Sequence, residues 1–171
     1  MLFFIYEGEG KENIMFYGHL DKQPHMEGWE EDKGPTTPII SEGRLYGRGS
    51  SDDGYVPFAL LLSLKNAVEQ KVRLPWIVLV LETEEESGSK DLVYLLKKNS
   101  DIIKEPSICI CLDSGCMDYK NLWLTSTLRG ICKFNLKVEI ASNGTHSGTG
   151  GGILPDTYRI LNILLGWLED L

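Results

Sequence analysis

The stretch "WIVLVLETEEE", from Trp76 to Glu86, decides the fold, because an unbroken apolar run is followed at once by acidic residues. A strand that is apolar on both faces is typical of the centre of a parallel sheet covered by helices on each side. Two further apolar runs also end in polar side chains, "IMFYGHLD" (Ile14–Asp21) and "ICICLDSG" (Ile108–Gly115). We therefore expect three strands of one sheet. Leu2 to Tyr6 is also apolar, and we expect it to form a hairpin or a closely spaced pair with the next strand.

Two segments between these strands have helical patterns. "PFALLLSLKNAVEQ" (Pro57–Gln70) begins with proline and repeats apolar residues at helical spacing. Ser89 to Asn99 combines an expected N-cap serine with basic residues in the last turn. The order strand, helix, strand, helix, strand predicts an α/β fold, with a mostly parallel sheet flanked by helices.

The pattern changes after Gly115. "LWLTSTLRGICKFNLKVEIA" (residues 122–141) predicts one or two longer strands, and a helix is expected after Pro155. We expect a boundary near Leu124 to Arg129, with a core domain in residues 1–125 and the beginning of an α+β unit in residues 126–171. The long loop from Lys22 to Gly49 is expected to hold only short strands, near Ile39 and Leu45.

Composition and charge exclude several classes of protein. The net charge of −8 argues against binding along a nucleic-acid backbone. No run of 18 apolar residues predicts a membrane span, and the first residues do not resemble a secretory signal, so we expect a cytoplasmic protein. The four cysteines lack the paired spacing of a structural zinc site. We expect them to be reduced, and we expect Cys109 and Cys111 to be buried in a strand.

The polar residues that follow the strands suggest a metal site. The carboxyl ends of strands converge in open α/β sheets, so His19, Glu85, Glu86 and Asp113 are expected to meet. Glycines around "SSDD" in "GRGSSDDG" (residues 47–54) allow a turn that delivers a further carboxylate from Asp52 or Asp53. One imidazole with several carboxylates suits zinc, manganese or cobalt. Two divalent ions would neutralise so many negative charges in one crevice.

Each of these features also has a purely structural interpretation. A single histidine after a strand is usually structural, "ETEEESGS" alone resembles a solvated acidic turn, and "SSDDG" alone resembles a turn or a helix cap. The shared position at strand ends favours the metal site, because the structural interpretations would all have to hold independently.

Five motifs occur in the order "GHLDKQP", "GRGSSDDG", "EEESGS", "CLDSG" and "THSGTGGG". Together they resemble the dinuclear zinc exopeptidase and amidohydrolase family that includes carnosinase, other cytosolic dipeptidases, aminoacylase and succinyl-diaminopimelate desuccinylase. The likeness is greatest to the carnosinase and dipeptidase branch. It implies a zinc-exopeptidase-like core with an α+β lid domain through which such enzymes form homodimers.

The resemblance implies a role for each metal-site residue. His19 and Asp113 would bind one ion, Asp52 would bridge two ions, and Glu86 would bind the second. Asp21 would hydrogen-bond the other imidazole nitrogen of His19 and fix its tautomer. The ions would be zinc, with manganese or cobalt as alternatives.

The resemblance also implies catalytic roles beyond the ligands. Glu85 would act as general base towards the attacking water, and His146 would reach from the lid domain to stabilise the oxyanion or hold the substrate. His25 matches no functional position and is expected to be an exposed loop residue.

Two departures from the family pattern affect these expectations. Resembling enzymes usually have a lysine two positions after the bridging aspartate, where this chain has Gly54. They also take a last metal ligand from a histidine beyond the lid domain, and no histidine follows His146. We therefore expect a fragment of a longer enzyme, with weak metal binding and little turnover of its own.

The expected reaction is metal-dependent hydrolysis of the amide bond of a dipeptide or short peptide. One alternative is an N-acyl amino acid deacylase or desuccinylase, because the same motifs serve both reactions. An alternative of a different class is a non-catalytic metal-binding remnant, or one half of a split enzyme.

Overall fold

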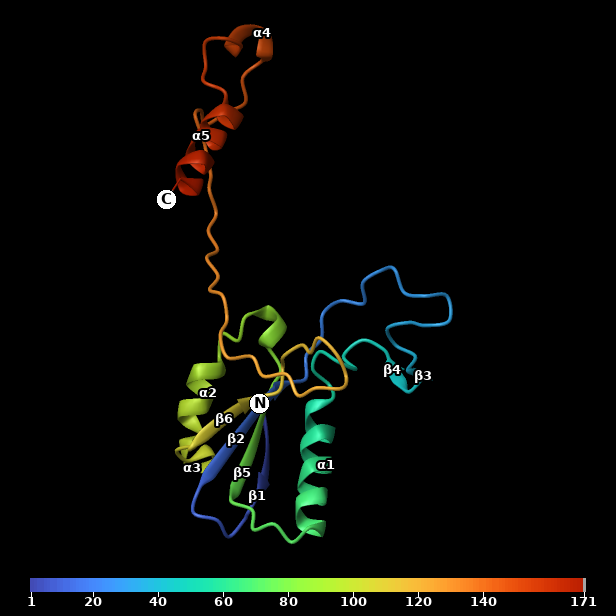
Figure 1. The fold of residues 1–171 in the computed structure, drawn as a ribbon. Helices are drawn as coiled ribbons and strands as arrows, with labels where there is room; N and C mark the ends of the chain where they lie inside the picture. Colours follow the sequence, from blue (N-terminus) through green and yellow to red (C-terminus); the bar gives the residue numbers. More distant parts are fainter. Residues whose placement is uncertain (171) are drawn as a thin grey trace. The chain divides into compact units, whose positions relative to one another are not determined.

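The computed structural model describes residues 1–170. They divide into two compact units, Met1–Leu124 and a second unit that begins at Thr125. The first unit holds a four-stranded sheet and its helices (Figure 1). Its elements, in chain order, are β1 (Leu2–Tyr6), β2 (Asn13–His19), β3 (Ile39–Ser41), β4 (Arg44–Tyr46), α1 (Val56–Glu69), β5 (Trp76–Glu82), the 3₁₀ helix η1 (Glu85–Ser87), α2 (Leu92–Lys98), α3 (Ser100–Ile103) and β6 (Ile108–Cys111).

The sheet has the strand order β1-β5-β2-β6. Strand β2 runs parallel to both β5 and β6, and β1 is antiparallel to β5. The predicted mostly parallel sheet flanked by helices is thus confirmed. The expected pairing of β1 with β2 is wrong, because β5 lies between them. As the most apolar strand, β5 gains the most from a neighbour on each side.

Strand β5 is the centre of the core on both faces of the sheet. On one face, Val56, Leu60 and Leu64 of α1 pack against Ile77 and Leu79. On the other face, Val78 and Val80 pack against Ile103 of α3. Figure 1 shows α1 on one side of the sheet and α2 and α3 on the other. These layers fix the carboxyl ends of β2 and β5, from which the candidate site is built.

Two details of the helices and loops differ from expectation or refine it. Ser89 does not cap α2, because the helix begins at Leu92 with Asp91 at the N-cap position. The Ser89 hydroxyl instead donates to Glu82, the last residue of β5. The short strands expected near Ile39 and Leu45 are β3 and β4, which pair with each other.

The cysteines are free, as expected, but they are exposed. The predicted burial of Cys109 and Cys111 is wrong because β6 is an edge strand, paired only with β2. Among residues 1–170, no helix combines the length and apolarity needed to cross a bilayer.

The second unit contains α4 (Ser147–Gly150) and α5 (Thr157–Glu169). Asp156 caps α5 by accepting from the backbone N–H groups of Tyr158 and Arg159. The strands expected in residues 122–141 do not form in the described chain. That segment alternates only partly, and an extended segment becomes a strand only when a second strand takes its hydrogen bonds.

Candidate metal centre

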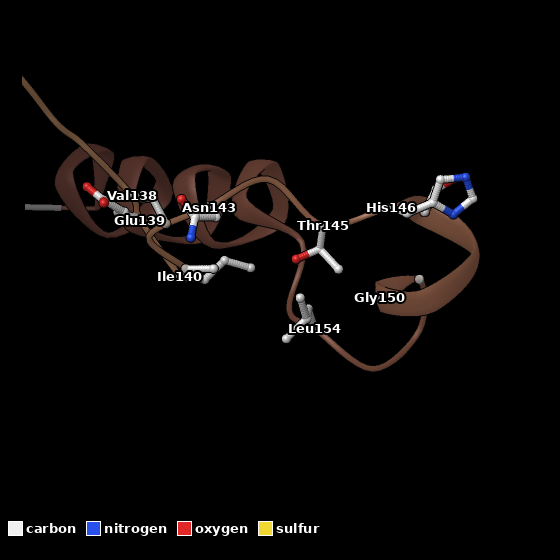
Figure 2. A pocket seen from close by; sticks show the side chains of 11 residues that line it. Val138, Glu139, Ile140, Asn143, Thr145, His146, Gly150 and Leu154 are labelled. Carbon is white, nitrogen blue, oxygen red and sulfur yellow. The ribbon is translucent and has the colours of Figure 1, made fainter.

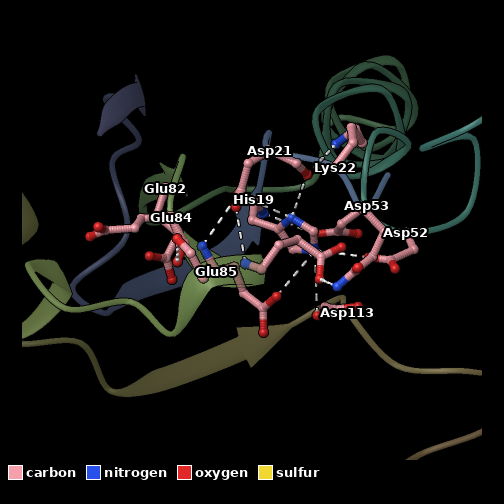
Figure 3. A network of polar contacts seen from close by, with 12 residues as sticks. His19, Asp21, Lys22, Asp52, Asp53, Glu82, Glu84, Glu85 and Asp113 are labelled. Atoms are coloured by element: carbon pink, nitrogen blue, oxygen red, sulfur yellow. Dashed lines mark hydrogen bonds and ion pairs between the residues drawn. The ribbon is translucent and has the colours of Figure 1, made fainter. Parts of the chain in front are cut away.

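His19 is the last residue of β2 and is fully buried, with 0% of its surface exposed. The residue before it must be small at this point. A Cβ on Gly18 would lie 2.6 Å from Oδ2 of Asp53 and 2.8 Å from a methyl group of Val56. Glycine therefore lets the end of the strand come close to the turn that carries Asp52 and Asp53, and Figure 3 shows His19 beside both residues.

The hydrogen bonds of His19 define which ring nitrogen points at the carboxylates. Its Nδ1 lies 3.0 Å from the main-chain oxygen of Asp21. A carbonyl oxygen only accepts, so Nδ1 must carry a proton and donate. Nε2 then faces three carboxylates, at 2.9 Å from Asp52, 3.7 Å from Asp113 and 4.0 Å from Glu85. This is the orientation that a metal-binding imidazole requires.

Asp21 connects two parts of the site. Its main-chain oxygen holds His19, while its carboxylate oxygen Oδ1 is 3.5 Å from Nδ1. The carboxylate accepts the backbone N–H groups of Glu85 at 3.3 Å and Glu86 at 3.0 Å. The main-chain oxygen of Asp21 is thus the main contact that orients His19. The side chain of Asp21 instead fixes the start of η1.

Asp52 and Asp53 have opposite environments although they are adjacent. The Asp52 side chain is 52% exposed and points its carboxylate at His19. Asp53 is fully buried, and its Oδ2 accepts the backbone N–H of His19 at 3.0 Å. Burial, together with the charge of Asp113, raises the pKa of Asp53 to about 6. Sequence reasoning gave Asp53 no separate role, and the doubled aspartate was the only signal for it.

The charges in this cluster of side chains are poorly balanced. Burial lowers the pKa of His19, but the bond to Asp21 and the charges of Asp113, Asp53 and Glu85 raise it by more. Burial raises the pKa of Glu85, and so do Asp113, Glu86 and Asp21. An excess of carboxylates around one imidazole favours bound cations.

The donor set fits divalent metal ions. One group joins His19, Asp52 and Asp113, and a second joins His19, Glu85 and Glu86, with donor atoms within 4.8 Å of one another. Within the described residues, the buried Oε1 of Glu86 and Oδ1 of Asp53 have no hydrogen-bond partner. Nitrogen and carboxylate donors at such spacing suit zinc or manganese. The structure therefore brings together five predicted residues, His19, Asp52, Glu85, Glu86 and Asp113.

A second polar network lies behind the site. Glu82, at the end of β5, is buried and accepts hydrogen bonds from Tyr17 and Ser89. Burial and the neighbouring Glu82 raise the pKa of Tyr17 strongly. This network anchors the point where β5 turns towards Glu85. Sequence reasoning missed it, because Tyr17 and Glu82 look like ordinary strand residues.

The other two histidines lie outside this cluster. His146 belongs to the second unit, where its ring accepts the backbone N–H of Gly148 at 3.1 Å and caps α4. It is exposed and lines a pocket of ≈ 340 Å³ with Thr145 and Leu154 (Figure 2). His25 is an exposed loop residue, as expected.

The chain belongs to the peptidase family M20/M25/M40, whose family model matches residues 15–143. It is 35% identical over 165 residues to the Beta-Ala-His dipeptidase of Rattus norvegicus, covering 94% of this chain and 33% of that protein. It is 32% identical over 162 residues to the Cys-Gly metallodipeptidase dug1 of Schizosaccharomyces pombe, covering 92% of this chain and 34% of that protein.

Solved structures of M20 peptidases share this fold. Human carnosine dipeptidase 1 superposes with a TM-score of 0.54 at 25% identity, covering 96% of this chain and 35% of that one. An M20 family metallo-carboxypeptidase from Sulfolobus solfataricus gives a TM-score of 0.58 at 26% identity, covering 66% of this chain and 26% of that one. The chain thus spans about a third of the length of the curated relatives it matches.

Proposed function

We propose that this chain forms part of the catalytic core of a metal-dependent hydrolase that cleaves the amide bond of dipeptides or short peptides. The observation that carries the proposal is the buried His19 imidazole, whose Nε2 hydrogen-bonds Asp52 and faces Asp113 and Glu85. The dipeptidase relatives in family M20/M25/M40 support the substrate class.

The proposal places two divalent ions, with zinc as the first candidate, among these side chains. His19 and Asp113 would hold one ion, Glu86 would hold the other, and the carboxylate of Asp52 would be a ligand that both share. The bound ions would polarise the substrate carbonyl and lower the pKa of water in the site. Asp21 keeps the proton of His19 on Nδ1, so that Nε2 stays available as a ligand.

Glu85 is the proposed general base. Its backbone is fixed by Asp21, while its side chain remains partly exposed and accessible to water. Its raised pKa brings it closer to the range in which a carboxylate accepts a proton and later returns it. Glu85 would take the proton of the attacking water and deliver it to the leaving amine.

Two further roles are proposed for the second unit. His146 would stabilise the developing oxyanion or hold the substrate, as a histidine with an exposed ring can. The second unit would also carry the contact of a homodimer. The core is proposed to be residues 1–125, and residues 126–171 begin the lid domain.

A second candidate activity is removal of an acyl group from an N-acyl amino acid. It is favoured by 36% identity over 107 residues to the succinyl-diaminopimelate desuccinylase of Nautilia profundicola, covering 61% of this chain and 27% of that protein. The same water activation by Glu85 would serve this reaction.

The test is amide hydrolysis by the longest polypeptide that contains this chain, loaded with zinc or manganese. The substrates are a dipeptide panel with β-Ala-His and Cys-Gly, and N-acetyl and N-succinyl amino acids. Replacing the general base in Glu85→Gln is expected to lower kcat by a factor of about 10³ or more without loss of metal binding.

Glu84→Gln is the matched control, because Glu84 lies in the same acidic run but contacts the backbone of Asp91. It should retain activity. Failure of every substrate with bound metal would overturn the proposal in favour of a metal-binding remnant. Equal activity of Glu85→Gln and the unaltered protein would overturn the assignment of Glu85 as general base.

A further inference from the structure

Lys22 comes directly after Asp21 in the sequence, and its side chain lies against the backbone of Gly49. A Cβ on Gly49 would be 2.3 Å from Cε and 2.4 Å from Cδ of Lys22. Gly49 also has a φ of +82°, which favours glycine. The absence of a side chain at Gly49 therefore leaves room for Lys22, which Figure 3 shows next to Asp21.

The ammonium group of Lys22 reaches the group that orients His19. Its Nζ donates to the main-chain oxygen of Asp21 at 3.1 Å, and the same oxygen accepts Nδ1 of His19 at 3.0 Å. A carbonyl oxygen has two lone pairs and can accept both bonds. Lys22 thus contacts the acceptor that sets the direction and tautomer of the imidazole.

The backbone near Lys22 leaves no room for a side chain at position 54. The N–H of Gly54 donates to the oxygen of Gly49 at 2.8 Å, and a Cβ on Gly54 would lie 2.4 Å from that oxygen. A lysine cannot occupy position 54 without a shift of this turn. Cε of Lys22 lies 3.8 Å from the place where that Cβ would be, so a cationic side chain reaches the same region from another loop.

We propose that Lys22 is a positioning residue of the metal centre, which fixes the Asp21 carbonyl and hence the orientation of His19. The inference deepens the proposed function and rests on it for the metal. The contact of Lys22 with Asp21 exists in the metal-free chain as well. The positioning role of Lys22 and the proposed function can therefore be tested separately.

The test compares Lys22→Met, which keeps the aliphatic chain and removes the charge, with Lys22→Arg, which keeps both charge and donors. Lys65→Met is the matched control, because Lys65 is 72% exposed on α1 and pairs only weakly with Glu69. Lys22→Gln serves as a second uncharged variant if Lys22→Met does not fold. Thermal unfolding of each metal-free protein checks the fold.

The first measurement is a long-range ¹H–¹⁵N NMR correlation of the metal-free protein. The Nδ1–H signal of His19 should be protected from exchange with water in the unaltered protein and in Lys22→Arg, and should exchange faster in Lys22→Met. The second measurement is zinc affinity by competition with a chelating dye. It should fall by about a factor of 10 in Lys22→Met, and stay within about threefold in Lys22→Arg and Lys65→Met.

An Nδ1–H signal that is equally protected in Lys22→Met would overturn the positioning role, whether or not the protein binds zinc. Equal zinc affinity of Lys22→Met and the unaltered protein would also overturn it. A protein that binds no zinc but shows the NMR difference would instead count against the proposed function and leave the Lys22 contact supported.

Discussion

Similar apolar sequence patterns have opposite structural outcomes in the two units of the chain. In the first unit, the apolar run of β5 is buried and paired on both sides, and its end delivers Glu85 and Glu86 to the site. In the second unit, apolar residues from Leu128 to Leu136 remain exposed and form no strand within the described residues. The difference shows that an apolar pattern positions functional side chains only where neighbouring strands and covering helices complete its hydrogen bonds and packing.

The largest expected contrast in stability comes from the same substitution in each unit. Leu79 on β5 is 2% exposed and packs in the cluster with α1, whereas Leu128 is 88% exposed. Leu79→Ala should lower the free energy of unfolding by about 3 kcal/mol, because it leaves a cavity in the core. Leu128→Ala should change it by less than about 0.5 kcal/mol.

Chemical denaturation followed by circular dichroism measures both variants. Similar losses of stability would show that the segment around Leu128 is packed as well as β5, and would break the comparison between the units.

A smaller effect is expected from the buried carboxyl of Asp53. Its pKa rises to about 6 in the fold through burial, against about 3.9 in an unfolded chain. The folded protein then binds more protons than the unfolded one between pH 4 and 6, so this group makes stability fall as pH rises through that window. The contribution should be about 2 kcal/mol, less than the full shift implies, because its exposed neighbour Asp52 admits water.

Asp53→Asn keeps an oxygen that can accept the His19 N–H and removes the charge. In metal-free protein, the difference in unfolding free energy between Asp53→Asn and the unaltered chain should grow in favour of the variant from pH 4 to pH 7. If the difference stays constant with pH, ionisation of Asp53 does not destabilise the folded protein, and the prediction is wrong.

The smallest effect on metal binding is expected from the histidine of the second unit. His146 is exposed and caps α4, and the described contacts do not include it among the metal-binding groups of the first unit. His146→Ala should therefore leave zinc affinity within about twofold, while lowering kcat of the proposed hydrolysis by a factor of about 10². Calorimetric zinc titration and steady-state kinetics on the same preparation separate the two effects. A large loss of zinc affinity would place His146 among the ligands.

The sequence was sufficient to predict the α/β sheet and the convergence of His19, Glu85, Glu86 and Asp113, because strand ends in such sheets meet by topology. It did not predict the neighbour of β1, since apolar runs do not specify which strands pair. The burial of Asp53 beside the exposed Asp52 also escaped it, because the two residues are chemically identical and only the turn distinguishes them. The strands expected in residues 122–141 do not form, because no second strand pairs with this segment within the described chain.

The exposure of the cysteines also could not be predicted from the sequence. Cys109 and Cys111 lie in an apolar strand, but this strand forms the edge of the sheet and both thiols are exposed. Burial depends on the position of a strand in the sheet, which composition does not reveal. The same holds for Lys22, whose role becomes visible only when Gly49 and Asp21 are seen around it.

The most direct test of the metal centre is a zinc titration of the metal-free protein by isothermal calorimetry, with His19→Ala compared with His25→Ala. His25 is the matched control, an exposed loop histidine outside the cluster. The unaltered protein and His25→Ala should bind two zinc ions per chain, and His19→Ala should lose affinity by a factor of about 100. Equal zinc binding by His19→Ala and His25→Ala would contradict the assignment of this cluster as the metal centre.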